Sequence, residues 1–108
     1  MRGENMETKN LEAKLIQLSK NYLSIQKAFL THIISNNYLN FSNPFIQFCF
    51  DVENAFYSLP SPLRKIINNE FFYQDFPEWW KSIYSKKHFT QLKKIAIYKF
   101  MEAYGEIK

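Results

Sequence analysis

The sequence predicts an all-α fold of about five helices, in which a long N-terminal helix precedes a helix-turn-helix-like unit of three helices. The 108 residues include only two glycines, Gly3 and Gly105, which disfavours tight β-hairpin turns. Apolar residues recur with helical spacing along most of the chain, and prolines stand where helices are expected to start. Aromatic residues make up 19% of the chain, which argues against intrinsic disorder.

The first expected helix follows a frayed polar start at residues 1–8 and continues for roughly thirty residues without Gly or Pro. Its apolar residues form a heptad seam with alternating spacings of four and three. The seam consists of Leu11, Leu15, Leu18, Tyr22, Ile25, Phe29 and His32. A second apolar stripe, on another side of the helix, consists of Ile16, Leu23 and Leu30. A helix that is apolar on two sides must be covered on two sides, so it is either the central helix of the fold or part of an oligomer interface.

An asparagine-rich connection over 36–43 leads to a second helix, with Asn43 as the cap and Pro44 in the first turn. This helix covers about 43–58 and is expected to be mainly core. Its inward positions are Phe45, Phe48, Cys49, Val52, Ala55, Phe56 and Leu59.

Three further helices are expected in the last part of the chain. Ser61 is the expected cap of a helix over 62–73, and Pro77 starts a short helix over 77–84. Ser85 caps the last helix, over 86–104, and Gly105 terminates it. We expect one domain, 1–108, composed of the long helix and connection (1–41), the core helix (43–58) and the helix-turn-helix-like unit (59–108).

The positive charge is concentrated in one segment. The formal net charge is +4, and no acid occurs between Glu78 and Glu102, where six lysines occur. This is the pattern of a phosphate-binding face, or alternatively of a solvated lysine-rich face. Helical geometry turns Phe89, Leu92, Ala96, Phe100 and Ala103 inward, and Lys87, His88, Thr90, Gln91, Lys94 and Tyr98 outward.

Residues 59–104 resemble a known class of DNA-binding unit. Leu59-Pro60 before a helix, the run from Trp79 to Phe89, and the run from Lys93 through Ala96 to Phe100 resemble the sigma-factor region-four helix-turn-helix. They resemble the ArpU-like phage and mobile-element transcription regulators more closely, with Ser85 opening the recognition helix. The richness in Asn, Lys, Ile and Phe is typical of an AT-rich bacterial genome, such as that of a mollicute.

The resemblance and the charge together predict a regulator that binds double-stranded DNA. The residues expected to face the major groove are Lys86, Lys87, His88, Thr90, Gln91 and Lys94. Phosphate contacts are expected from Arg64, Lys65, Lys81 and Lys93. Two departures from the sigma pattern leave open the alternative of a degenerate module, which has kept the fold and lost DNA binding. Tryptophans stand where the first helix of the motif usually has a small residue, and the turn has no glycine.

The alternative is a protein–protein interaction module, either a homodimer or a protein associated with RNA polymerase. Adjacent tryptophans cannot both be buried on one face of a helix, so we expect one to be core and the other to cover an edge or to meet a partner. The interface expected in this case consists of Trp79, Trp80, Leu11, Leu15, Leu18 and Tyr22.

The sequence shows no pattern typical of an enzyme. One cysteine, Cys49, and two distant histidines provide no metal site. Phosphate-binding glycine loops and nucleophile motifs are missing. We therefore expect no catalytic residue, cofactor, metal or small-molecule substrate. No apolar run is long enough to span a bilayer, and nothing resembles a signal peptide, so we expect a cytoplasmic protein without membrane contact.

Overall fold

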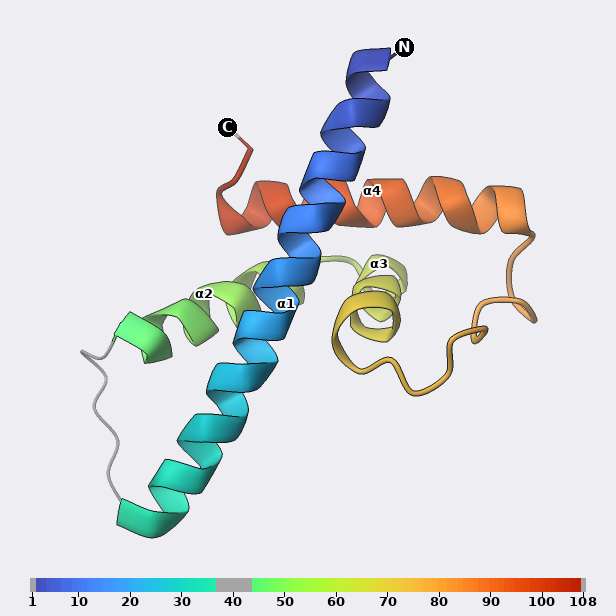
Figure 1. Cartoon of the computed structure of the whole chain (residues 1–108). Coiled ribbons are helices and arrows are strands. Elements are labelled where there is room, and N and C mark those ends of the chain that lie inside the picture. Colours follow the sequence, from blue (N-terminus) through green and yellow to red (C-terminus); the bar gives the residue numbers. More distant parts are fainter. Residues whose placement is uncertain (1, 37–43, 108) are drawn as a thin grey trace.

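Four α-helices and one π-helical turn make up the described part of the computed structural model, residues 2–36 and 44–107. They are α1 (Arg2–Asn36), α2 (Pro44–Tyr57), α3 (Ser61–Ile67), the π-helical turn η1 (Asn68–Phe72) and α4 (Lys86–Tyr104). No strand occurs in these ranges, which confirms the all-α prediction. The long α1 lies across α4 (Figure 1). Helix α2 packs against both of them, whereas α3 packs against α4 and the adjoining η1 contacts α1. Side chains are described for residues 8–28 and 44–107.

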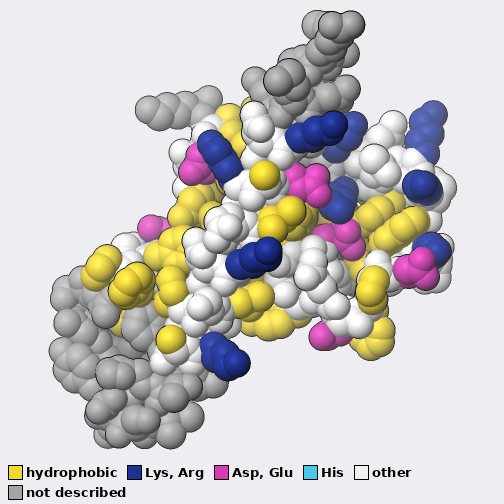
Figure 2. Space-filling view, viewed as in Figure 1, with side chains coloured by type: hydrophobic (Ala, Val, Ile, Leu, Met, Phe, Trp, Pro, Cys, Tyr) yellow, Lys and Arg dark blue, Asp and Glu magenta, His cyan; other side chains and the backbone are white. Residues whose placement is uncertain are grey.

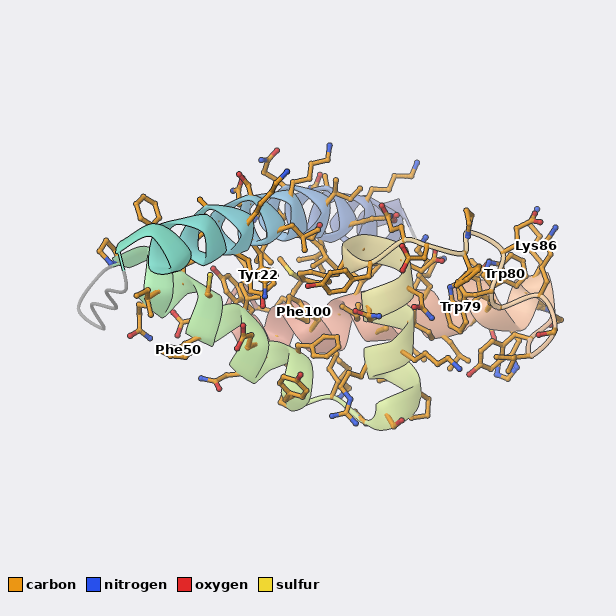
Figure 3. All side chains as sticks on the ribbon, turned by 90° about the horizontal axis from the view of Figure 1, so that it is seen from below. Tyr22, Phe50, Trp79, Trp80, Lys86 and Phe100 are labelled. Atoms are coloured by element: carbon orange, nitrogen blue, oxygen red, sulfur yellow. The ribbon has the colours of Figure 1, made fainter. Side chains whose placement is uncertain are left out.

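The core lies where α1, α2, η1 and α4 meet. Leu15 from α1, Val52 from α2 and Phe100 from α4 are almost completely shielded from solvent. Figure 3 shows Tyr22 and Phe100 between the helices near the middle of the molecule, and Trp79, Trp80 and Lys86 toward one end. The part of the heptad seam that contains Leu15, Leu18 and Tyr22 is therefore covered by helices of the same chain, because all three belong to this cluster. Phe29 and His32 of the predicted seam lie outside the described side chains.

Two expected helix starts differ from the structure. The N-terminal segment is not frayed, since α1 already begins at Arg2. Glu, Met and Lys in this segment are good helix formers, which offsets the lack of apolar residues. In the third helix, Ser61 lies inside α3 and the cap position is Pro60, without a side-chain hydrogen bond. Pro44 is the first residue of α2, as predicted, whereas the expected cap Asn43 lies outside the described residues.

The expected helix over 62–73 is divided into α3 and η1. The backbone N–H of Tyr73 donates to the carbonyl of Asn68 at 2.9 Å, a bond that spans five residues and widens the last turn. Both Phe71 and Phe72 are buried beside this turn. We attribute the wider turn to these two adjacent rings, which a regular helix would direct to faces 100° apart.

The short helix expected over 77–84 is absent, so the structure has four α-helices rather than five. Successive turns replace it, with N–H bonds from Trp79 to Phe76, from Lys81 to Glu78 and from Ile83 to Trp80. Both tryptophan rings pack against Phe89 on α4. Consecutive side chains of a regular helix diverge too far for this arrangement, so tertiary packing of the rings overrides the Pro77 start signal.

The last helix agrees closely with the prediction. It spans Lys86–Tyr104, and the backbone N–H of His88 donates to the Ser85 hydroxyl at 3.2 Å. Gly105 ends the helix with φ 100°, in the left-handed region that favours glycine. Two inward assignments were wrong, because Ala103 and Phe45 are exposed. Residues one or two positions away are buried instead, Ile46 on α2 and Met101 on α4, and Ile97 on α4 is a further core residue that was not predicted.

Replacing Ser85 with alanine should destabilise the protein by about 1 kcal/mol, because the His88 N–H loses its side-chain acceptor. Chemical denaturation followed by circular dichroism measures this loss. Ser82→Ala is the matched control, since Ser82 is exposed in the preceding turns. Equal stability of the two variants would contradict the capping role.

Candidate nucleic-acid interface

The exposed face of α4 carries a stripe of cationic and polar side chains. Lys87, Gln91, Lys94 and Tyr98 follow each other at spacings of four, three and four, which places them on one side of the helix. All four are exposed, as are the neighbouring Lys86, His88 and Thr90. The structure therefore brings all six residues predicted to face the groove to the surface of one helical segment.

Acidic side chains do not neutralise the cations of this stripe. Within the described ranges, no carboxylate forms an ion pair with Lys86, Lys87 or Lys94. Basic side chains, drawn in dark blue, lie over the N-terminal part of α4, at the right of the face in Figure 2. The free N–H groups of the first turn of a helix add partial positive charge at the same end.

A groove of about 500 Å³ separates this part of α4 from the start of α1. Its cationic lining comes from Lys9 on α1 and from Lys86, Lys93 and Lys94 on α4, and Trp80 forms part of the wall. The Trp80 ring stacks on Phe89, with centroids 4.5 Å apart and an interplanar angle of 4°. Lys9 was not predicted as a site residue, because only the crossing of α1 over α4 places it here.

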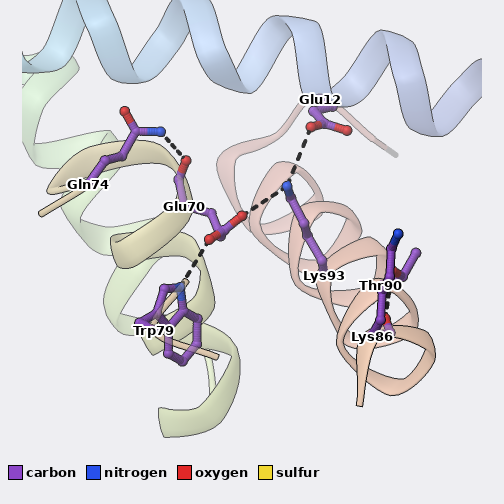
Figure 4. Close-up of polar contacts among 7 residues, drawn as sticks. All are labelled: Glu12, Glu70, Gln74, Trp79, Lys86, Thr90 and Lys93. Carbon is purple, nitrogen blue, oxygen red and sulfur yellow. Dashed lines mark hydrogen bonds and ion pairs between the residues drawn. The ribbon is translucent and has the colours of Figure 1, made fainter. Parts of the chain in front are cut away.

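Lys93 differs from its neighbours because its side chain is partly buried and its ammonium group pairs with carboxylates of the same chain. It lies 3.0 Å from Glu70 Oε1 and 3.8 Å from Glu12 Oε2, and the Phe71 ring centroid is 5.5 Å away (Figure 4). The other oxygen of Glu70 accepts a 3.0 Å hydrogen bond from the Trp79 indole N–H. Lys93 therefore joins α4 to η1 and α1, and it is not available as the phosphate contact that was expected.

Replacing Glu70 with glutamine should cost about 1–3 kcal/mol, because one change weakens the acceptors of both Lys93 and Trp79 in a partly buried site. Thermal unfolding measures the loss of stability, and the Trp fluorescence of the native state reports the weakened hydrogen bond of Trp79. The matched control is Glu78→Gln, which breaks only the exposed ion pair with Lys81. That pair is expected to contribute about 1 kcal/mol or less. A Glu70 variant as stable as the Glu78 variant would contradict the joining role.

The remaining predicted phosphate contacts lie in other surroundings. Lys81 pairs with Glu78 in the turns before α4. The Arg64 guanidinium lies 5.8 Å from the Tyr57 ring centroid, and the Lys65 ammonium lies 5.7 Å from that of Trp79. These two α3 residues engage aromatic rings of their own chain, and they do not extend the stripe on α4.

The residues predicted to form a partner interface are mostly internal. Leu15, Leu18 and Tyr22 are buried, and Leu11 is partly buried against the same core. Trp79 and Trp80 are both partly buried, and both rings contact Phe89. The expectation of one core tryptophan and one that covers an edge or meets a partner assumed a helix over 77–84, and this segment forms turns instead.

Metal-binding and membrane-spanning features were also sought in the described residues. They contain no group of three His, Cys, Asp or Glu side chains that could hold a metal ion. Over the same ranges, no helix combines the length and apolar character needed to cross a membrane. The groove on α4 is also lined by the carboxylates of Glu12 and Glu70, which pair with Lys93. The ammonium groups of Lys86 and Lys94, which no described carboxylate pairs with, suit the binding of an anion.

No protein-family model matches this chain, and no curated protein or solved structure is significantly similar to it.

Proposed function

We propose that this protein binds double-stranded DNA through the N-terminal half of α4, as a transcription-regulator-like protein. The observation that carries the proposal is the exposed stripe of Lys87, Gln91 and Lys94, with Lys86 beside it. No carboxylate of the described residues forms an ion pair with these three lysines. Lysines supply attraction to phosphates, and glutamine can contact adenine in the major groove.

The position of α4 supports this proposal. The helix is anchored by Phe89, Ala96 and Phe100, which are buried, so the opposite side is presented to solvent as a rigid surface. A rigid helix places several cations at fixed spacing and loses little conformational freedom when it binds. The electropositive N-terminus of α4 favours a nearby phosphate in addition to the lysines.

The resemblance to sigma region-four and ArpU-like regulators is part of the proposal, with one modification. In those proteins a helix precedes the recognition helix, whereas here residues 77–84 form turns. In our proposal these turns support α4 through the contacts of Trp79 and Trp80 with Phe89. We therefore expect phosphate contacts to dominate and base readout to be weak.

Fluorescence anisotropy of labelled AT-rich duplex DNA, titrated with the protein at several salt concentrations, tests the proposal. We expect affinity in the micromolar range or tighter at low salt, falling steeply as salt rises because each neutralised phosphate releases counterions. With Lys86, Lys87 and Lys94 engaged, the slope of log K against log salt should be about −2.7. The absence of binding at 20–50 mM salt would overturn the proposal.

One observation favours a second candidate function, a protein–protein interaction module. The segment before α4 exposes Phe76, 76% accessible, and Ile83, 53% accessible. Large apolar side chains exposed close together are typical of contact surfaces. In this alternative, residues 75–84 meet a partner, such as a subunit of RNA polymerase. A Phe76→Ser/Ile83→Ser variant that keeps full DNA affinity but loses a captured partner would favour this second role.

A further inference from the structure

A pocket distant from the α4 stripe combines aromatic rings with one carboxylate. It lies between α1, α2 and η1 and has a volume of about 260 Å³, which suits a single side chain or a small ligand. Glu53 contributes the carboxylate. The rings that line the pocket come from Tyr22, Phe56, Tyr57, Phe72 and Tyr73.

The rings that line the pocket also contact one another. Tyr22 and Phe72 meet edge to face, with centroids 5.6 Å apart, and Phe56 meets both Tyr57 and Phe72 in the same manner. The face of an aromatic ring attracts a cation, and several rings around one space form the cages that bind alkylated ammonium groups.

A chain of hydrogen bonds ends on the carboxylate. Tyr73 Oη donates to Gln26 Oε1 at 3.1 Å, and Gln26 Nε2 donates to Tyr22 Oη at 3.3 Å. Tyr22 Oη in turn donates to Glu53 Oε2 at 2.5 Å. Burial, and then the neighbouring Glu53, raise the pKa of Tyr22, so its hydroxyl remains a donor. The carboxylate of Glu53 therefore accepts the last hydrogen bond of this chain at the pocket.

A positive partner for Glu53 is missing from the described residues. None of the lysines and arginines in these ranges forms an ion pair with it. The ring of Tyr57 already attracts one cation of the protein, the Arg64 guanidinium. A partly buried carboxylate in a pocket lined by aromatic rings is complementary to a cation whose surface is largely apolar.

We propose that this pocket binds an organic cation, an alkylated ammonium or a guanidinium group. The aromatic rings of Tyr22, Tyr57 and Tyr73 would contact its alkyl or planar surface, and Glu53 would balance its charge. Such a group occurs in free small molecules and in the side chains of peptides. The proposal does not depend on DNA binding, because none of the pocket residues belongs to the α4 stripe.

The test uses the full chain labelled with ¹⁵N and two pairs of matched probes, followed by NMR chemical shifts. Choline is compared with 3,3-dimethylbutan-1-ol, which has the same shape without the charge. N-acetyl-arginine methylamide is compared with its citrulline counterpart in the same way. We expect saturable shifts around Tyr22, Gln26 and Tyr73, with affinity for each cation at least about tenfold higher than for its neutral counterpart.

The two cationic probes distinguish the source of the ligand. Tighter binding of choline indicates a free alkylammonium compound, and tighter binding of the arginine derivative indicates a peptide side chain. Equal affinity for the charged and neutral members of both pairs would overturn the proposal. So would the absence of shifts around the pocket with both cations.

Two variants make the assignment specific. Glu53→Gln retains an acceptor for the Tyr22 hydroxyl but removes the charge, and it should weaken choline binding about tenfold. Tyr73→Leu removes one ring from an exposed position, and Tyr98→Leu on α4 is its control. The first leucine variant should bind choline more weakly, whereas the second should bind it as the unmodified protein does. Unchanged affinity in a folded Glu53→Gln variant would contradict the proposal.

Discussion

Replacing Lys87 and Lys94 together with glutamate should reduce DNA affinity by about 100-fold or more at low salt, because two attractions to phosphates become repulsions. The slope of log K against log salt should become shallower by about 1.8, the share of two phosphates. Both side chains are exposed, so the free energy of unfolding should change by about 0.5 kcal/mol or less per site. Anisotropy with the labelled duplex measures the affinity, and circular dichroism measures the stability.

A matched control separates the effect of a lysine's position on DNA affinity from the effect of the total charge. Lys94→Glu and Lys20→Glu change the net charge equally, but Lys20 is an exposed residue of α1 and not part of the α4 stripe. The α4 variant should lose most of its affinity, and the α1 variant should keep most of it. Equal losses would indicate attraction by net charge alone. A folded double variant with normal affinity would exclude this face of α4 as the binding surface.

Replacing Phe100 with alanine should destabilise the fold by about 3–5 kcal/mol, because it leaves a large cavity among residues that cannot fully collapse into it. Phe100 is completely buried, and its ring lies 6.3 Å from that of Phe72 and 6.4 Å from that of Tyr104. Small domains are typically stable by only about 5–15 kcal/mol, so this loss is a large part of the total. Urea denaturation followed by circular dichroism measures it.

The neighbouring residue provides the control for this prediction. Lys99→Ala shortens an exposed side chain on the same helix and should change the free energy of unfolding by about 0.5 kcal/mol or less. Similar stability of the Phe100 and Lys99 variants would show that the interior of the fold differs from the one described.

Local chemistry made α4 the most predictable element. The cap at Ser85, the terminator at Gly105 and the inward positions Phe89, Ala96 and Phe100 all depend on residues close in sequence. Helical spacing also identified Leu15 and Leu18 as core, although it left open whether they pack within one chain. The packing of these two residues against distant helices settles that point for the seam.

Long-range packing determined the features that could not be predicted. The turns at 77–84 depend on Phe89 accepting both tryptophan rings, and the π-helical turn depends on the burial of two adjacent phenylalanines. The charge pattern marked Lys93 as a surface cation, because Glu12 and Glu70 are distant in sequence and meet it only in the folded protein. Lys9 at the groove and the pocket around Glu53 could not be predicted for the same reason, because both depend on contacts between residues distant in sequence.

The contact between α1 and α4 has a consequence for the order of folding during synthesis. About 80 residues separate Tyr22 from the end of α4, and the apolar seam of α1 is completed only when α4 packs against it. At elongation rates of about 5–20 residues per second, the end of α4 is synthesised roughly 4–16 s after Tyr22. During this interval, Leu15 and Leu18 are exposed to other chains and to chaperones. The nascent protein is therefore most prone to aggregation before α4 leaves the ribosome.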